Sequence, residues 1–226
     1  SDVYKRQFDT SLNKTYVTFG EDEKIIIPKA LSSDEEKYHS AYLVPELLNL
    51  LKQEKITFGD IDVIGINEGP GSFTGIRICT VIARTAAQQL GIKVIPVPSL
   101  EILARINKTD KDTLVLLDAR KNKVYAAVYD KNGAEKPAPH ALNIDELDEL
   151  IKSNNFEIIT DSSIHKLLEE KNISSTNYEA DNYELGKYLY NIVCEKSKTD
   201  NDYHWAKAKP LYIQPPSITM PKKVVQ

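Results

Sequence analysis

One pattern occurs twice along this chain and constrains its fold more than any other feature. An apolar segment ends in an aspartate, a polar turn follows, and a second strand-like segment comes after the turn; the two aspartates are Asp9 and Asp118. Strand-like and helical segments follow in both halves. The sequence therefore predicts two related α/β subdomains, residues 1–102 and 103–226, with the boundary in the stretch 98–111.

Hydrophobic periodicity and turn chemistry predict the elements of each half. We expect Gly91 to end a helix, and Pro45 to kink or shorten the helix that follows Ser40. The first half should hold strands ending at Phe8 and at 15–19, 24–27, 61–66 and 93–97, with helices carrying Leu43 to Leu51 and spanning 72–90. The second half should hold strands at 113–117, 123–129 and 156–160, helices at 144–151, 164–170 and 183–195, and an irregular tail after Trp205.

The composition is that of an ordinary globular protein. The 226 residues are 41% hydrophobic and 27% charged, which differs from the composition of disordered chains. Lys plus Arg (29) against Asp plus Glu (33) gives a net charge of -4, so no positive field extends over the whole sequence. If RNA is involved, we expect a partner protein to supply much of the binding.

Cysteine usage and hydropathy indicate a reducing cytoplasm. Cys79 and Cys194 lie far apart and fit neither a disulfide framework nor a zinc-site spacing. No apolar run approaches the roughly 20 residues of a membrane span, and the first residues do not resemble a signal peptide. We therefore expect a cytoplasmic protein with no membrane association.

The first seven residues fit poorly with the strand that should end at Phe8. Asp2, Lys5 and Arg6 place three charges where a buried strand disfavours them. We hypothesise that residues 1–7 are foreign to the natural protein. A genomic read through the start codon that reproduced them would refute this hypothesis.

A glycine-rich segment, GPGSFTGIR at residues 69–77, lies between an expected strand and an expected helix. Such loops often cradle phosphates with bare backbone N–H groups and the positive end of a helix. Here Gly71 and Gly75 are too close for a P-loop, and no Lys-Ser/Thr pair follows. The spacing of Gly69, Gly71 and Gly75 has one residue too many for the dinucleotide fingerprint. Both phosphate-binding motifs are therefore rejected, and Ser72 is expected to be the N-cap of the helix.

The helix after this segment has an unusual composition. Small residues recur at spacings of three and four, which lets another helix approach closely. The only charges between Gly69 and Leu90 are Arg77 and Arg84, so these arginines need acidic partners or solvent. These residues fit internal packing and an intermolecular interface about equally well. The small residues are Gly75, Cys79, Ala83, Ala86 and Ala87.

The segment GPGSFTGIRI, residues 69–78, resembles the signature of the TsaB family, also called YeaZ, a companion subunit in bacterial tRNA threonylcarbamoyladenosine synthesis. The resemblance covers about the first 130 residues in the family's order, and the later part matches mainly as architecture plus Pro210 to Tyr212. Gln214 stands where similar proteins usually carry an arginine. The other matching segments are Phe8 to Ser11, His39-Ser40, Pro98 to Leu100, Leu117 to Arg120, Val124-Tyr125 and Pro210 to Tyr212.

The resemblance implies an α/β, actin-like ATPase (ASKHA) fold of two related subdomains with a degenerate ATP site. It implies a non-catalytic scaffold or dimerization subunit of the tRNA adenosine threonylcarbamoyltransferase complex, which modifies the adenosine beside the anticodon in tRNAs reading codons that start with A. The expected partners are TsaD, in a heterodimer, and the ATPase TsaE; a homodimer is possible, and tRNA is contacted through the complex. ATP and a metal ion are expected in the partner subunits.

Two observations from the residues agree with the absence of a cofactor in this chain. After Gly91 only Gly133 and Gly186 remain, so the second half lacks glycine-rich loops for a nucleotide. The four histidines of the chain, His39, His140, His165 and His204, are scattered, and no metal site is readable.

The resemblance also implies site residues. The signature helix and the helix before it should form the interface with TsaD or with a second copy. Replacing Gly75 or Ala83 with a bulky residue should then break assembly while the monomer stays folded. The interface set is His39, Tyr42, Gly71, Ser72, Phe73, Thr74, Gly75, Arg77, Ile78, Cys79, Ala83 and Arg84, and the vestigial nucleotide region is Asp9, Thr10, Asp118 and Arg120.

Three other functions fit less well. A free-standing ATP-dependent kinase or acyltransferase could use Asp9 and Asp118 to position magnesium, but the glycine count disfavours it, and both aspartates fit turn caps. A serine hydrolase using Ser72, His39 and Asp9 lacks the G-x-S-x-G spacing. Independent RNA binding would rest on a basic tail beside Trp205, namely Lys207, Lys209, Lys222 and Lys223, and the acidic balance of the chain opposes it.

Overall fold

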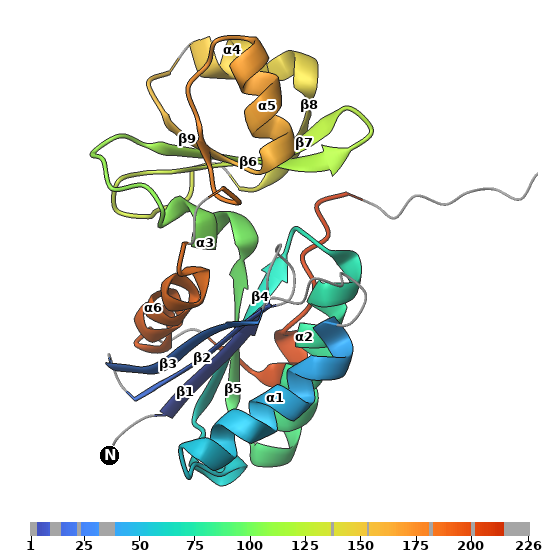
Figure 1. The fold of residues 1–226 in the computed structure, drawn as a ribbon, viewed down its shortest axis with the longest axis vertical. Helices are drawn as coiled ribbons and strands as arrows, with labels where there is room; N and C mark the ends of the chain where they lie inside the picture. Colours follow the sequence, from blue (N-terminus) through green and yellow to red (C-terminus); the bar gives the residue numbers. More distant parts are fainter. Residues whose placement is uncertain are drawn as a thin grey trace, which may run out of the picture.

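The chain folds into two lobes, one above the other (Figure 1). The computed structural model describes residues 4–9, 15–21, 24–31, 39–136, 138–152, 154–180, 183–199 and 202–214. Each lobe is built on a five-stranded sheet. This is the mixed α/β architecture expected from the sequence.

The first sheet has the strand order β3-β2-β1-β4-β5. β1 pairs antiparallel with β2 and parallel with β4, so it lies in the middle of the sheet. Residues 4–7 belong to this strand, and whether they are native stays a prediction. The bounds are β1 Tyr4–Asp9, β2 Thr15–Glu21, β3 Lys24–Leu31, β4 Val63–Gly69 and β5 Lys93–Pro98.

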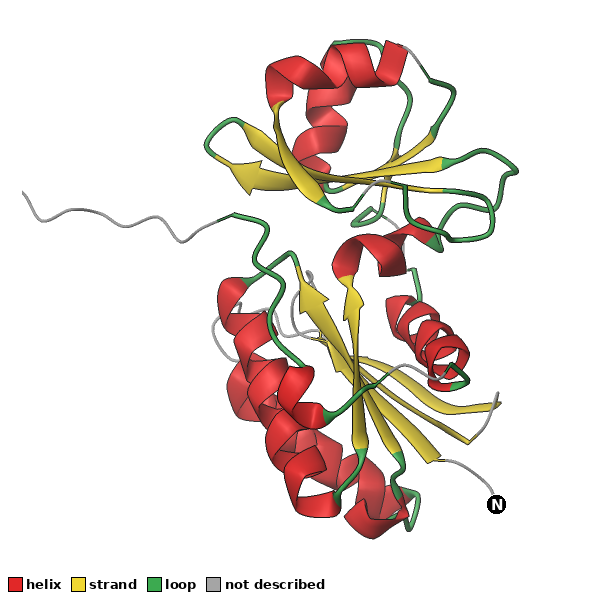
Figure 2. Ribbon diagram, turned by 180° about the vertical axis from the view of Figure 1, so that it is seen from behind, coloured by secondary structure: helices red, strands yellow, loops and turns green. Residues whose placement is uncertain are grey.

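Helices cover both faces of the first sheet (Figure 2). α1 (His39–Gln53) and α2 (Phe73–Leu90) lie on one face, with the short 3-10 helix η1 (Phe58–Asp60) between them in sequence. α6 (Leu185–Ser197) lies on the other face. α1 continues through Pro45, so Pro45 does not shorten its first turns, and the alternative of a kink stays a prediction. Leu43, Leu47, Leu50 and Leu51 are buried, as their helical spacing predicted.

The second sheet has the order β10-β9-β6-β7-β8, with its own helices on the face turned away from the first lobe (Figure 1). Ile164 and Leu168 of α5 pack with Leu114 and Leu116 of β6 in its core. The strands are β6 Thr113–Arg120, β7 Lys123–Tyr129, β8 His140–Asn143, β9 Glu157–Thr160 and β10 Thr176–Asn177. The helices are η2 Ile144–Glu146, α4 Leu147–Lys152 and α5 Ser162–Glu170.

The two lobes have the same topology. Read from β8 to β10, the second sheet repeats the first: three antiparallel strands, then two parallel strands reached through helices. The prediction of two related subdomains is therefore confirmed. The sequence did not predict β8 and β10, because they are only 4 and 2 residues long and carry no clear alternation. It also missed α3 (Ser99–Ala104), which lies within the stretch assigned to the boundary.

The structure corrects the predicted division at residue 102. α6 packs against the first sheet, and the 3-10 helix η3 (Trp205–Lys207) packs against α2, so the chain returns to the first lobe after finishing the second. Apolar residues of α6, α3 and both sheets share one continuous core. A sequential division fails because α6 buries its apolar face on a sheet far away in the sequence.

Candidate functional site

The turn that precedes α2 is fixed by buried side chains. Asn67 and Ser99 are both fully buried. The Asn67 Oδ1 atom accepts hydrogen bonds from the Gly69 backbone N–H at 2.9 Å and from the Ser99 hydroxyl at 2.7 Å. Gly69 has a φ of 102°, and a Cβ there would come within 2.6 Å of the Ile76 Cδ1 atom. β4 therefore delivers the chain to α2 in one defined geometry.

α2 begins and ends with the residues that the sequence indicated. The Ser72 hydroxyl oxygen accepts a hydrogen bond from the Gly75 N–H at 3.2 Å, which makes Ser72 the N-cap. Gly91, with a φ of 67°, ends the helix in the left-handed conformation. The helix therefore presents a fixed set of side chains on each face.

The small-residue face of α2 is internal. Gly75, Cys79, Ala83 and Ala87 are buried, and the last three share a core with α1, β4 and β5. This corrects the expectation that Gly75, Cys79 and Ala83 contact another protein. The closely packed neighbours are elements of this chain, so a bulky residue at Gly75 or Ala83 would disturb the monomer itself.

The opposite side of α2 is exposed, together with part of α1 and the C-terminal segment. Every large hydrophobic side chain that is exposed in the described part of the chain lies here. Val81 is 62% exposed and Phe73 is 47% exposed. We define the exposed apolar surface as Val44 and Leu48 of α1, Phe73 and Val81 of α2, and Tyr212.

Arg77 contacts aromatic residues. Its Nε donates to the Tyr212 hydroxyl at 2.9 Å, and its Cζ lies 3.8 Å from the centroid of the Phe73 ring. The centroids of the Phe73 and Tyr212 rings are 5.4 Å apart. These contacts attach the C-terminal segment to the first turns of α2.

Arg84 makes a similar contact two turns further along α2. Its Nη1 donates to the backbone oxygen of Ala208 at 3.4 Å, and its Cζ lies 6.0 Å from the centroid of the Trp205 ring. A groove with a volume of about 410 Å³ lies between α2 and the C-terminal segment. It is lined by Arg77, Thr80, Val81, Arg84, Thr85, Gln88, Trp205, Pro210 and Tyr212.

The remaining members of the predicted interface set differ in how exposed they are. Gly71 and Thr74 are exposed at the start of α2, and Ile78 is partly buried. His39 and Tyr42 lie in the first turns of α1, and their side chains lie outside the described part of the structure. The set as an intermolecular interface stays a prediction.

A titratable group lies beside the turn. Burial raises the pKa of Glu68 to about 7; Lys196 opposes the rise and Glu101 adds to it. The Lys196 ammonium pairs with Glu101 at 2.7 Å, between α6 and α3. The backbone oxygen of Glu68 accepts from the Leu211 N–H at 2.7 Å, which ties β4 to the C-terminal segment.

In the predicted vestigial nucleotide region, Asp118 acts as a turn residue. It accepts from the Arg120 N–H at 2.7 Å, and its own N–H donates to the Asp161 carboxylate at 2.5 Å. Arg120 has a φ of 61°. Thr10 and the Asp9 side chain lie outside the described residues, so the use of Asp9 together with Asp118 to position magnesium is not tested. Among the described residues, no group of three or more potential ligands could hold a metal ion.

The sequence did not predict the roles of several residues in the exposed apolar surface and in the turn before α2. Val44 and Leu48 carried a usable signal, an i, i+4 apolar pair beside the buried leucines of α1. Asn67 carried none, because its partner Ser99 comes from a helix that the sequence did not predict. Gln214, which stands where similar proteins usually carry an arginine, has a buried Nε2 with no hydrogen-bond partner in the described structure.

Known proteins match this chain in sequence and in fold. A TsaB protein of Buchnera aphidicola subsp. Acyrthosiphon pisum, described as a tRNA threonylcarbamoyladenosine biosynthesis protein, is 35% identical over 46% of this chain and 48% of its own length. The Bacillus subtilis TsaB protein is 34% identical over 60% of this chain and 62% of its own. The family model described as TsaD, tRNA N6-adenosine threonylcarbamoyltransferase, matches residues 26–194. The chain belongs to this family, in its TsaB (YeaZ) group.

Solved structures agree with a TsaB-group fold. A Pseudomonas aeruginosa protein described as similar to peptidase YEAZ superposes with a TM-score of 0.73 at 19% identity, covering 94% of this chain and all of the other. The actin-like ATPase fold class predicted from the sequence is confirmed. The alignment of this TsaB-group chain spans about half to three fifths of the length of the two curated relatives, 48% and 62%. Among the described helices, none combines the length and apolar character needed to cross a membrane.

Proposed function

We propose that this chain is the TsaB-type scaffold subunit of a tRNA adenosine threonylcarbamoyltransferase complex in the cytoplasm, required for threonylcarbamoyladenosine formation. One observation carries the proposal: in the described part of this family member, the exposed large hydrophobic side chains all lie on α1, α2 and the C-terminal segment. Large apolar side chains exposed in one region of a surface are typical of protein–protein contacts. The partner is a TsaD-type subunit, and a TsaE-type ATPase joins the assembled pair.

The last two glycines in the sequence have structural roles, which disfavours catalysis by this chain alone. Gly133 has a φ of 82° in the turn after β7. At Gly186 in α6, a Cβ would meet the Thr18 Oγ1 atom at 2.6 Å, so this glycine permits helix–sheet packing. Both serve the fold. ATP and a metal ion are accordingly assigned to the partner subunits, and tRNA is contacted through the complex.

The test is assembly with the cognate TsaD-type protein. Leu48→Glu and Val81→Glu each place a charge on the exposed apolar surface, where burial against a partner would desolvate it. We expect each variant to bind about thirtyfold more weakly, by calorimetric titration and co-elution, with an unchanged melting temperature. Ser163→Glu, on the exposed side of α5, is the matched control and should bind like the wild type.

Unchanged binding in both variants would place the interface elsewhere. A reconstituted modification assay with tRNA then separates scaffold from enzyme. The complex should require this chain, and the purified chain alone should turn over no ATP. ATP turnover by the chain alone would favour the alternative, a free-standing kinase or acyltransferase.

A further inference from the structure

We propose that the groove between α2 and the C-terminal segment receives a partner helix that carries two carboxylates, one for Arg77 and one for Arg84. This inference rests on the proposed function and specifies the chemistry of the partner. The groove holds about 410 Å³ and lies beside Val81, the most exposed member of the exposed apolar surface.

The two guanidinium groups are held in place by this chain, and no carboxylate of the described residues neutralises them. Arg77 uses Nε for Tyr212, and Arg84 uses Nη1 for the backbone of Ala208. Phe73 and Trp205 contribute ring faces, which fix a guanidinium plane and leave its N–H edges available. Within the described residues, no ion pair joins either arginine to a carboxylate. The site therefore carries two positive charges with free donors.

Carboxylates are the group that these donors fit. A guanidinium binds a carboxylate through two parallel hydrogen bonds, and the pair is strongest where a partner excludes water. α2 supplies no acidic residue of its own from Phe73 to Leu90. The complementary charge must come from outside the helix.

The spacing of the arginines specifies the shape of the partner. Seven residues along a helix correspond to about 10 Å, or two turns. A partner helix that runs along α2 would therefore present acidic residues at positions i and i+7. Its apolar residues between them would cover Val81.

Two other occupants are less suitable. A symmetric contact of α2 with α2 of a second copy would bring four arginines into one interface, and α2 carries no acidic residue to offset their repulsion. RNA phosphates would satisfy the arginines but leave Val81, which lines the groove, uncovered. A heterologous protein helix satisfies both the charge and the apolar surface.

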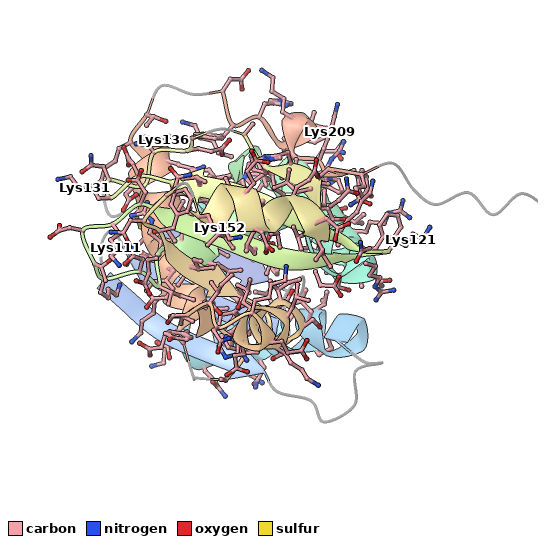
Figure 3. All side chains as sticks on the ribbon, turned by 90° about the horizontal axis from the view of Figure 1, so that it is seen from above. Lys111, Lys121, Lys131, Lys136, Lys152 and Lys209 are labelled. Atoms are coloured by element: carbon pink, nitrogen blue, oxygen red, sulfur yellow. The ribbon has the colours of Figure 1, made fainter. Side chains whose placement is uncertain are left out.

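The test uses charge reversal in the full chain, with the cognate TsaD-type protein as the probe. R77E/R84E should weaken binding by about a hundredfold or more, because like charges would then meet on the two sides. R77K/R84K keeps the charges and should lose no more than about tenfold. K152E/K166E, on α4 and α5 of the second lobe, makes the same change in net charge and should bind like the wild type; Lys152 is labelled in Figure 3.

Salt dependence and self-association give independent readouts. Wild-type affinity should fall as ionic strength rises, with a shallower slope for the neutral variant R77Q/R84Q. Sedimentation velocity should show that R77Q/R84Q self-associates at least as strongly as the wild type, because the repulsion between copies is removed. Circular dichroism and melting curves check that every variant is folded.

The outcomes separate this inference from the proposed function. If the wild type binds and R77E/R84E binds equally well, the TsaD-type partnership stands and carboxylate recognition is wrong. If R77E/R84E loses tRNA binding in a filter titration but keeps its protein partner, the groove is an RNA site and the inference is overturned. If the wild type binds no TsaD-type protein, the proposed function fails and the inference fails with it.

Discussion

The two lobes share one strand order, but their corresponding helices differ in what they bury and what they expose. α2 buries small residues such as Cys79 and Ala83, and it exposes Val81 and two arginines. α5, the helix at the same topological position in the second lobe, buries Ile164 and Leu168 and is charged on its outer side at positions such as Lys166, Glu169 and Glu170. At this position one lobe exposes an apolar side chain and two arginines, and the other exposes charged side chains.

The strand ends before these helices also differ. Asp161, directly after β9, caps α5 by accepting from the Ile164 N–H at 2.9 Å, and it also accepts from the Asp118 N–H. Burial raises the pKa of Asp161, while these backbone hydrogen bonds lower it. Glu68, near the end of β4, has its pKa raised to about 7 by burial. Equivalent strand ends thus hold one carboxylate used for capping and one that gains a proton near neutral pH.

The largest expected effect tests whether the small face of α2 is internal. Ala83→Trp should destabilise the monomer by about 3 kcal/mol or more, because the closely packed α1 and β4 leave no room for the ring. Gln89→Trp, exposed on the same helix, should change the free energy of unfolding by less than about 0.5 kcal/mol. Urea denaturation measures both. A stable Ala83→Trp monomer that fails to assemble would restore the intermolecular role of this face.

An intermediate effect is expected at Glu68 and depends on pH. The folded-state pKa of about 7 lies above the ordinary 4.5, so the folded form binds more protons between these values and wild-type stability falls as pH rises through that window. Glu68→Gln removes the buried charge and should be more stable than the wild type by about 2 kcal/mol at pH 8. The difference should fall below about 0.5 kcal/mol at pH 4.5. A difference in stability that is the same at both pH values would contradict this account.

The smallest effect compares the two helix caps. Ser72→Ala removes one hydrogen bond at an exposed N-cap and should cost about 1 kcal/mol. Asp161→Ala removes two acceptors at a more buried site and should cost about twice as much. Thermal unfolding of both single variants ranks them. The reverse order would show that α2 depends on its first turn more than α5 does.

The sequence was sufficient for the order of elements and for the caps of α2. Local periodicity carried that information, because apolar side chains at strand and helix spacing reveal the inward face. The sequence could not decide whether Cys79 and Ala83 face the interior of the monomer or another protein, because small residues suit both kinds of packing equally. The burial of those residues depends on α1 and β4, whose positions no local pattern encodes.

The contacts of Arg77 and Arg84 could not be predicted from local sequence patterns either. Tyr212 is 135 residues from Arg77, and Ala208 is 124 residues from Arg84. No periodicity connects positions so far apart. The sequence showed that both arginines lacked partners on α2; only the tertiary structure supplied aromatic rings in place of carboxylates.

The return of α6 to the first sheet has a consequence for biosynthesis. Leu189, Ile192 and Val193 of α6 complete the core that Ile95 and Val97 of β5 begin. On the ribosome, the lobe that is made first therefore waits for the last helix, while the second lobe has all its own strands by residue 177. Until α6 emerges, the nascent first sheet lacks the helix that covers one of its apolar faces, and exposed apolar surface of this kind favours aggregation.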